Sequence, residues 1–287
     1  YQQTTKDQIL SLPMSQSTGY KRAVINAGEI ANKGIEASLS FVPVKTKNFT
    51  WDASVNFAKN DNEVVKLHDE VKDFELASAR WANASIYASE GQPYGVIVGK
   101  KLKRTEKGDV IFENGLPTFD DKVSVLGNGN YDFTLGFRNA FTYKNLSMSV
   151  LFDMKFGADI YSMSAMQSHV NGTSKETLEG RQEWYSSEQK RQSAGVPAGN
   201  WIATGGYVGK GVMAIKNDDG EMIYVPNNVC VDPAKYWQAL QTTSPEPFIY
   251  DNSFVKLREI SLSYNCPKKW FVHTPIESIT LSAYGRN

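Results

Sequence analysis

The chain has 287 residues, a formal net charge of +0 and a hydrophobic content of 41%. No run of apolar residues approaches the roughly 18 that a transmembrane helix needs, so the sequence excludes a helical membrane protein. The balanced charge provides no basic surface for nucleic acid, and we expect no nucleic-acid partner.

The mean hydropathy of -0.41 is compatible with a membrane β-barrel, because a barrel strand turns only every second residue toward lipid. The sequence starts at Tyr1 without a start methionine or an apolar leader, and it stops at Asn287 without an obvious tail. We therefore expect a fragment of a longer protein, and the missing leader then says nothing about the compartment.

After a long leading segment, 11–33, apolar and polar residues alternate with period two and predict a β-hairpin over 34–58. Its arms, 34–44 and 49–58, are joined by a short turn. One face of the two arms carries the apolar side chains of Ile35, Ala37, Leu39, Phe41, Phe49, Trp51, Ala53, Val55 and Phe57.

A long connection, 59–130, leads to the second predicted hairpin, 131–156. Inside the connection, 94–104 and 110–113 flank a glycine turn signal, and we expect a further small hairpin there. The apolar face of the second hairpin is interrupted only by Asn139 and carries Tyr131, Phe133, Leu135, Phe137, Phe141, Tyr143, Leu146, Met148, Val150, Phe152 and Met154.

A second long connection, 157–253, precedes the third predicted hairpin, 254–284, which turns near 267–275. Its stretch 175–191 is rich in Glu, Gln, Lys and Arg and predicts a short surface helix. The run 217–221 lacks most positions of a calcium loop, so we expect a plain turn. The apolar face of the third hairpin carries Ile260, Leu262, Tyr264, Ile279, Leu281 and Ala283.

Arms of about ten residues suit tilted membrane strands, which are longer than most strands of soluble proteins. The short turns fall on one rim of the predicted sheet, whereas both long connections and the segment 11–33 leave from the other. Short turns on one rim and long loops on the other are typical of outer-membrane barrels. A soluble β-sandwich also has alternating strands and is the alternative fold.

Cys230 and Cys266 are predicted on opposite rims and therefore unbonded, because a disulfide needs Cα atoms within about 7 Å. The three histidines are far apart in loop-like sequence, and we expect exposed or incidental residues rather than metal ligands. The sequence has no nucleophile elbow and no phosphate-binding loop. We expect no enzyme, no metal and no cofactor.

Four segments, in order and across nearly the whole chain, resemble the SusC/RagA family of TonB-dependent outer-membrane transporters. They are 26–36 (NAGEIANKGIE), 49–64 (FTWDASVNFAKNDNEV), 126–128 (LGN) with the strand 132–143, and 254–264 (FVKLREISLSY) with the closing Gly285-Arg286-Asn287.

This resemblance implies an antiparallel transmembrane β-barrel, of which residues 1–287 are the C-terminal part, with the plug domain and the last strands absent. It also implies the outer membrane of a Gram-negative bacterium and energy from a TonB complex acting through the missing N-terminal region. A SusD-like surface lipoprotein and a glycan or peptide substrate are the partners that it implies, beside outer-membrane lipid.

Two motif positions have a physical interpretation of their own. Gly28 and Gly34 flank a loop entering a strand, where a left-handed or crowded backbone favours glycine. Arg258 and Glu259 are adjacent in a strand and should face opposite sides, the inward one as a structural charge of the lumen.

Aromatic residues of the long loops are the candidate contacts for a ligand or partner, because flat rings stack on sugar faces and bury a large area. The alternative is that they pack the loops against one another. The candidates are Trp81, Trp184, Tyr185, Trp201 and Trp237. Two functions follow: outer-membrane nutrient import, or a soluble or surface-attached all-β carbohydrate-binding module, which would need no detergent.

Overall fold

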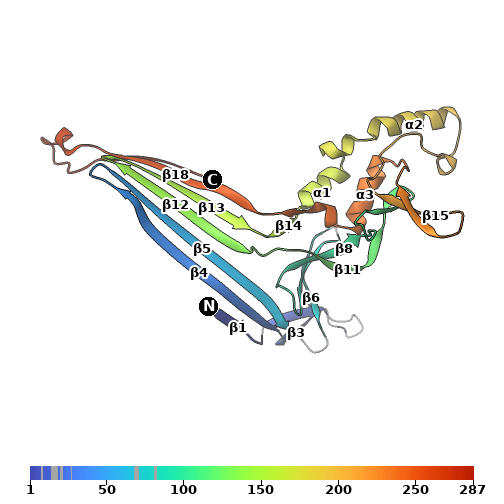
Figure 1. Ribbon diagram of the computed structural model, residues 1–287, viewed down its shortest axis with the longest axis horizontal. Helices are drawn as coiled ribbons and strands as arrows, with labels where there is room; N and C mark the ends of the chain where they lie inside the picture. Colours follow the sequence, from blue (N-terminus) through green and yellow to red (C-terminus); the bar gives the residue numbers. More distant parts are fainter. Residues whose placement is uncertain (8, 14–18, 20–21, 27, 68–70, 81–82) are drawn as a thin grey trace.

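The computed structural model describes the chain except residues 8, 14–18, 20–21, 27, 68–70 and 81–82. The molecule is elongated, with a long sheet at one end and smaller sheets and helices gathered at the other (Figure 1). The long sheet is antiparallel, seven-stranded and ordered β1-β4-β5-β12-β13-β18-β19. Its strands are β1 (Gln2–Thr5), β4 (Glu29–Lys45), β5 (Phe49–Lys66), β12 (Phe133–Tyr143), β13 (Leu146–Phe156), β18 (Phe254–Asn265) and β19 (Thr280–Arg286).

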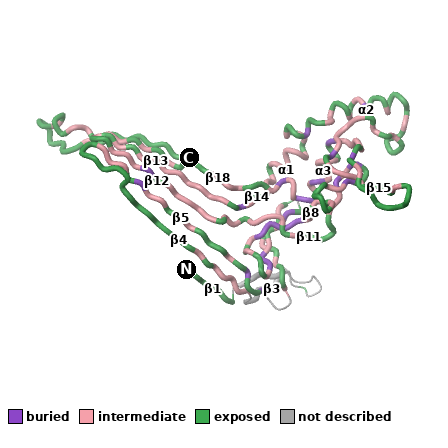
Figure 2. Tube along the Cα trace, viewed as in Figure 1, coloured by how far each residue is buried: buried purple, intermediate pink, exposed green. Residues whose placement is uncertain are grey.

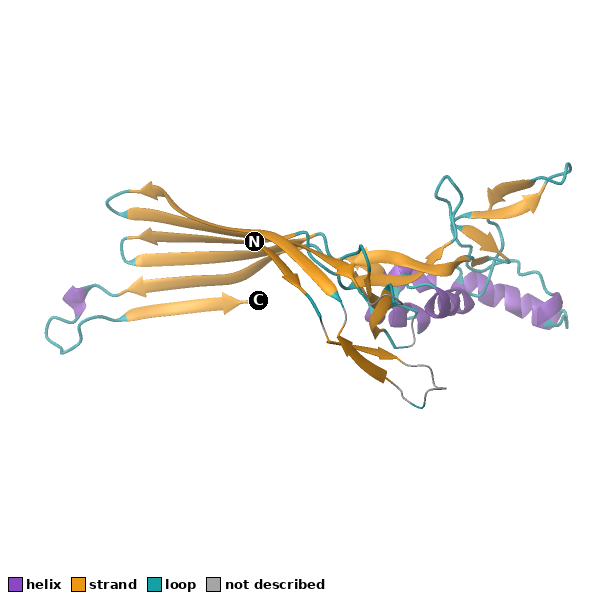
Figure 3. Ribbon diagram, turned by 90° about the horizontal axis from the view of Figure 1, so that it is seen from below, coloured by secondary structure: helices purple, strands orange, loops and turns teal. Residues whose placement is uncertain are grey.

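The three predicted hairpins are present as β4–β5, β12–β13 and β18–β19. Strands β4 and β5 have 17 and 18 residues, so the expected length of about ten is wrong for them. They are longer because their pairing continues beyond the other strands, where Glu29 faces Lys66, into the region of the long connections. All three turns lie at the end of the sheet away from the α-helices, and the β18–β19 turn contains the short 3₁₀ helix Lys268–Trp270 (Figure 3).

The alternation predicted along each strand becomes two continuous faces across the sheet. One row runs from Leu39 through Val55, Phe137 and Phe152 to Leu257, each opposite the next. No described segment covers this apolar face as a second sheet would, and Leu39 is 61% exposed. An apolar face open to the surroundings contradicts the β-sandwich alternative, whose inner faces are buried against each other.

Asn139, the exception on the apolar face, has a partner. The indole nitrogen of Trp51 donates to Asn139 Oδ1 over 3.0 Å, and Asn139 is buried. A buried amide with a hydrogen-bond partner avoids most of the cost of leaving water.

The opposite face of the sheet is polar. Ser38 donates to Asn56 over 2.7 Å, and Arg286 forms an ion pair of 2.8 Å with Glu259. The register of β13 and β18 shifts between Leu151 and Phe152, which leaves Arg258 as the extra residue of a bulge. Glu259 therefore lies on the polar face and Arg258 in the bulge, which fits the expectation that one of these two adjacent residues carries a charge on the polar face.

The long connections fold into structure of their own, which contains most of the buried residues (Figure 2). Two four-stranded sheets lie there, ordered β11-β8-β7-β6 and β10-β9-β15-β16, with two-stranded pairs β14–β17 and β2–β3. Their strands are β2 (Ile9–Pro13), β3 (Arg22–Asn26), β6 (Asp73–Ser78), β7 (Ser85–Ser89), β8 (Val96–Leu102), β9 (Ile111–Glu113), β10 (Leu116–Pro117), β11 (Phe119–Asn128), β14 (Asp159–Tyr161), β15 (Val212–Lys216), β16 (Met222–Pro226) and β17 (Ile249–Asp251).

Three α-helices complete this loop region: α1 (Met163–Val170), α2 (Arg181–Ser193) and α3 (Pro233–Thr243). Met166, Leu240 and Phe248 form one buried apolar cluster of this region. A second cluster, of Val64, Leu67 and Ala88, packs the end of β5 against β7 and so joins the region to the wall. None of the helices in the described part of the chain has the length and apolar character to cross a bilayer.

Two predictions for the connections need correction. The helix expected over 175–191 is interrupted at Gly180, whose φ of 74° ends the short 3₁₀ helix Lys175–Leu178 before α2 begins. The small hairpin near Gly108 is reduced to the single bridge between Arg104 and Val110. Strand β8 pairs instead with β7 and β11, and β9 pairs with β10 and β15.

Candidate functional site

A cavity of about 380 Å³ opens between the C-terminal end of α1, the start of α2 and the start of α3. It brings together three of the five predicted aromatic residues. Its walls are His169, Val170, Asn171, Gly172, Thr177, Arg181, Trp184, Tyr185, Asp232, Pro233, Ala234 and Trp237.

Trp237 forms the inner wall. Its ring lies 4.5 Å from that of His169 and 5.1 Å from that of Tyr236, which it meets edge-on. The helix that carries it begins at Asp232, whose side chain accepts a 2.9 Å hydrogen bond from the amide of Ala234. This N-cap fixes the start of α3 and with it the position of the ring.

Trp184 and Tyr185 are consecutive residues of α2 and line the same cavity. Trp184 is half-buried, whereas Tyr185 is 61% exposed. An exposed ring beside a half-buried one leaves an aromatic surface on which a flat ligand group can lie.

Trp201 does not line the cavity. Its indole nitrogen donates to Ser187 Oγ over 3.0 Å, and the amide of Thr204 donates to the same oxygen over 2.9 Å. Trp201 thus ties the segment after α2 back onto that helix. Trp81, the remaining candidate, lies outside the described residues.

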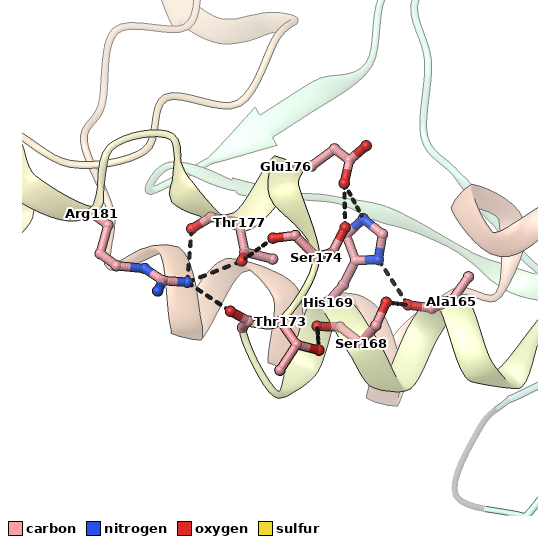
Figure 4. Close-up of polar contacts among 9 residues, drawn as sticks. Ala165, Ser168, His169, Thr173, Ser174, Glu176, Thr177 and Arg181 are labelled. Atoms are coloured by element: carbon pink, nitrogen blue, oxygen red, sulfur yellow. Dashed lines mark hydrogen bonds and ion pairs between the residues drawn. The ribbon is translucent and has the colours of Figure 1, made fainter.

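Arg181, one of the residues that line the cavity, bonds to the turn between α1 and α2 (Figure 4). Its Nη2 lies 3.1 Å from the carbonyl of Gly172, 3.2 Å from that of Thr177 and 3.0 Å from Thr177 Oγ1. A single guanidinium nitrogen therefore holds the loop between α1 and α2. Arg181 and the acidic Asp232 are both among the residues that line the cavity.

His169 is the polar member of the inner wall. Its Nδ1 lies 2.8 Å from the carbonyl of Ala165, so Nδ1 carries a proton, and its Nε2 is 3.7 Å from the carboxylate of Glu176 (Figure 4). A hydrogen bond from Ser174 holds the pKa of Glu176 below its usual range. The expectation of an exposed loop residue is wrong for His169: it lies in α1, and its side chain is 12% exposed.

Within the described residues no group of three histidine, cysteine or acidic side chains is arranged to hold a metal ion. Cys230 and Cys266 are both free, as predicted. Cys266 lies in the turn after β18, where its amide donates to Ile279 over 2.9 Å, and Cys230 lies in the loop region.

The motif glycines lie where a side chain would be strained or crowded. Gly28 has a φ of 105°. A Cβ on Gly34 would lie 2.6 Å from the carbonyl of Lys59. A Cβ on Gly127 would lie 2.8 Å from that of Asp159, whose carboxylate accepts from the amide of Asn128 over 2.9 Å. The LGN motif therefore joins β11 to β14.

No family model matches the sequence. TonB-dependent receptor P3 of Formosa agariphila is 24% identical over 99% of this chain, which spans 26% of that receptor. TonB-dependent receptor SusC of Bacteroides thetaiotaomicron is 37% identical over 46% of this chain and 13% of its own length. A structure of the RagAB peptide transporter superposes on 100% of this chain and 28% of its own, with a TM-score of 0.65 and 18% identity.

These likenesses confirm the resemblance to the SusC/RagA family of TonB-dependent transporters. They also confirm the fold class, since the antiparallel sheet superposes on part of a transporter barrel. The matched proteins are receptors and a transporter, which confirms the prediction that the chain is not an enzyme.

Proposed function

We propose that this chain, similar along its length to TonB-dependent receptors, forms wall and extracellular loops of a nutrient importer in the outer membrane of a Gram-negative bacterium. The observation that carries the proposal is the apolar face, which is continuous across the long sheet and exposed at Ile35 and Leu39. In water such a face would promote aggregation, whereas in a bilayer it lies against hydrocarbon.

The arrangement of connections sets the orientation within this proposal. The short turns face the periplasm and the loop region faces outward, as in bacterial barrels. Residues 1–287 are the C-terminal part of the barrel, and energy comes from a TonB complex acting on a plug domain outside this chain. The imported nutrient is a glycan or an oligopeptide.

The cavity of the loop region is the proposed contact for the ligand or for a SusD-like lipoprotein. Trp184, Tyr185 and Trp237 supply its aromatic rings, of which Tyr185 is exposed and Trp237 packs against His169. Arg181 and Asp232 add one charge of each sign, which suits a ligand with hydroxyl or amide groups better than a wholly apolar one.

The topology can be tested in the full-length transporter with its native cysteines, Cys230 and Cys266 among them, changed to serine. We expect a membrane-impermeant maleimide on intact cells to label Asp218→Cys, in the β15–β16 turn, and to leave Asn145→Cys, in the β12–β13 turn, unlabelled. Labelling of both positions on intact cells, or a transporter that is monodisperse in buffer without detergent, would contradict the proposal.

The cavity is tested separately by the double variant Trp184→Ala/Tyr185→Ala. We expect reduced uptake of the cargo or reduced co-purification of the lipoprotein, at unchanged abundance in the outer membrane. Tyr224→Ala is the matched control, because Tyr224 is 53% exposed on β16 and does not line the cavity. If Tyr224→Ala lost as much uptake or co-purified lipoprotein as the double variant, the effect would not be specific to the cavity, and the proposed contact would be wrong.

A further inference from the structure

The turn rim of the long sheet concentrates positive charge. We define it as residues 45–48, 144–145 and 266–279, which connect the strands of the three hairpins. It contains five lysines and one carboxylate, Glu277, although the whole chain has 31 basic and 31 acidic side chains. The lysines are Lys45, Lys47, Lys144, Lys268 and Lys269, all exposed, and among the described residues none is paired with a carboxylate.

The three turns form one continuous strip, because hydrogen bonds join each to the next. The amide of Lys144 donates to the carbonyl of Asn48 over 2.8 Å. The side chain of Asn145 donates to the carbonyl of Asn265 over 2.7 Å, and the amide of Asn265 donates back to Asn145 over 2.8 Å. The lysines are thus held along a common edge of the wall.

Two residues of the strip, Lys144 and Trp270, contact the apolar face, whereas Lys45 is the register partner of Thr50 on the polar face. Tyr143 and Tyr264 lie on the apolar face, since both are register partners of Leu146. The ammonium of Lys144 lies 5.4 Å from the ring centre of Tyr143, and the ring of Trp270 lies 6.4 Å from that of Tyr264. The rim therefore places the cation of Lys144 and the ring of Trp270 where the apolar face ends, with the other lysines along the same edge.

We propose that the turn rim binds the anionic headgroups of phospholipids in the adjacent leaflet, an inference that rests on the proposed membrane location. Acyl chains lie along the apolar rows while the lysine ammonium groups meet the phosphates, and the side chains are long enough to reach past the rings. The exposed apolar residues of the long turn, Trp270, Val272 and Ile276, enter the interface beside them. A binding site for an acidic protein would need cations directed away from the apolar face, whereas the ammonium of Lys144 lies beside Tyr143 on that face.

The test uses the full-length transporter in detergent and native mass spectrometry with phosphatidylglycerol or phosphatidylcholine of matched chains. We expect tighter binding of phosphatidylglycerol, weakened about tenfold or more in K45Q/K47Q/K144Q/K268Q/K269Q, because each lysine near an anionic surface adds to the affinity. The control K101Q/K103Q/K107Q/K122Q/K190Q removes five exposed lysines of the loop region and should leave the preference unchanged.

Lys268 and Lys269 lie in a turn outside the strands, so the double variant K268Q/K269Q keeps the test valid where the fivefold variant misfolds. We expect this double variant to lose part of the preference for phosphatidylglycerol. Equal binding of the two lipids by the wild type, equal losses in the control, or displacement of the lipid by polyglutamate at low concentration would overturn the proposal. Insertion into vesicles is scored separately: failure to insert contradicts the transporter proposal, whereas insertion without lipid preference contradicts only the headgroup site.

Discussion

The indole nitrogen of Trp51 and the side-chain oxygen of Asn139 form a 3.0 Å hydrogen bond on the apolar face of the sheet. The two residues belong to paired strands, with Trp51 opposite Phe141 and Asn139 opposite Ala53. Ring stacking of Trp51 on Phe141, at 5.8 Å between centres, holds the indole over the amide. A polar pair on the apolar face is therefore satisfied within the sheet.

Asn139→Ala tests this pair. The change leaves the indole N–H without its acceptor, and we expect a loss of about 1–3 kcal/mol in the free energy of unfolding. The double variant Trp51→Phe/Asn139→Leu removes both polar groups and should recover most of that loss. Urea unfolding of the full-length transporter in lipid vesicles measures both, and a double variant as unstable as Asn139→Ala would refute the assignment.

Neighbouring residues of β4 distinguish the two faces. Leu39→Arg places a charge on the apolar face and should cost about 2–4 kcal/mol if the residue lies near the bilayer midplane. Ser40→Arg places the same charge on the polar face and should change stability little. Because Leu39 is 61% exposed, a soluble protein would tolerate both changes, so equal stability of the two variants would contradict a lipid-facing wall.

Gly127→Ala should loosen the contact between β11 and β14 in the loop region. The new methyl group would lie 2.8 Å from the Cβ of Asp159, and we expect about 1–3 kcal/mol of destabilisation from the overlap. Faster hydrogen exchange at the amide of Asn128 reports the loss of its bond to Asp159. Gly129→Ala is the control, since its Cβ would approach only the carbonyl of Gly95, at 3.5 Å.

The aromatic cluster behind the cavity should weaken at alkaline pH. Burial raises the pKa of Tyr236 above its ordinary value of 10.0, and burial followed by the charge of Glu179 raises that of Tyr207. Both tyrosines stay protonated in the folded state after the unfolded state has begun to ionise. Their contribution to stability is therefore complete below about pH 10 and declines as the pH rises toward the folded pKa values.

Protease sensitivity of the loop region between pH 9 and 12, read with absorbance at 295 nm, checks this prediction. Tyr236→Phe should flatten the decline, because the substituted ring cannot ionise. The exposed Tyr224→Phe should leave it as in the wild type. Identical profiles for Tyr236→Phe and the wild type would show that another group controls the alkaline transition.

The turns and faces of the wall could be predicted because each depends on residues close in the chain. A side chain's face follows from its parity along the strand, and the short connections fix the register of each hairpin. The ends of β4 and β5 could not be predicted, since their last pairs form where the pattern of alternation has faded, at Ile30 with Val64 and Glu29 with Lys66. The bulge at Arg258 could not be predicted either, because the sequence Arg258-Glu259 is compatible with a regular strand as well as with a bulged one.

The candidate site was predicted only in part. Aromatic residues in long loops were a sufficient signal for Trp184, Tyr185 and Trp237, which the structure places around one cavity. Nothing in the sequence separated them from Trp201, whose indole bonds to Ser187 instead. The roles of Arg181 and His169 were not predicted, because their contacts depend on how the turn between α1 and α2 folds and, for His169, on the ring of Trp237.

By itself, then, the sequence determined a two-faced antiparallel wall with turns at one rim, and its motifs indicated the transporter family. Only the tertiary structure decided how the loops fold, which aromatic rings meet, why Asn139 is tolerated and how the lysines of three turns join into one strip. The physical reason is range: alternation is set by neighbouring residues, whereas a cavity or a shared edge is set by contacts between segments far apart in the chain.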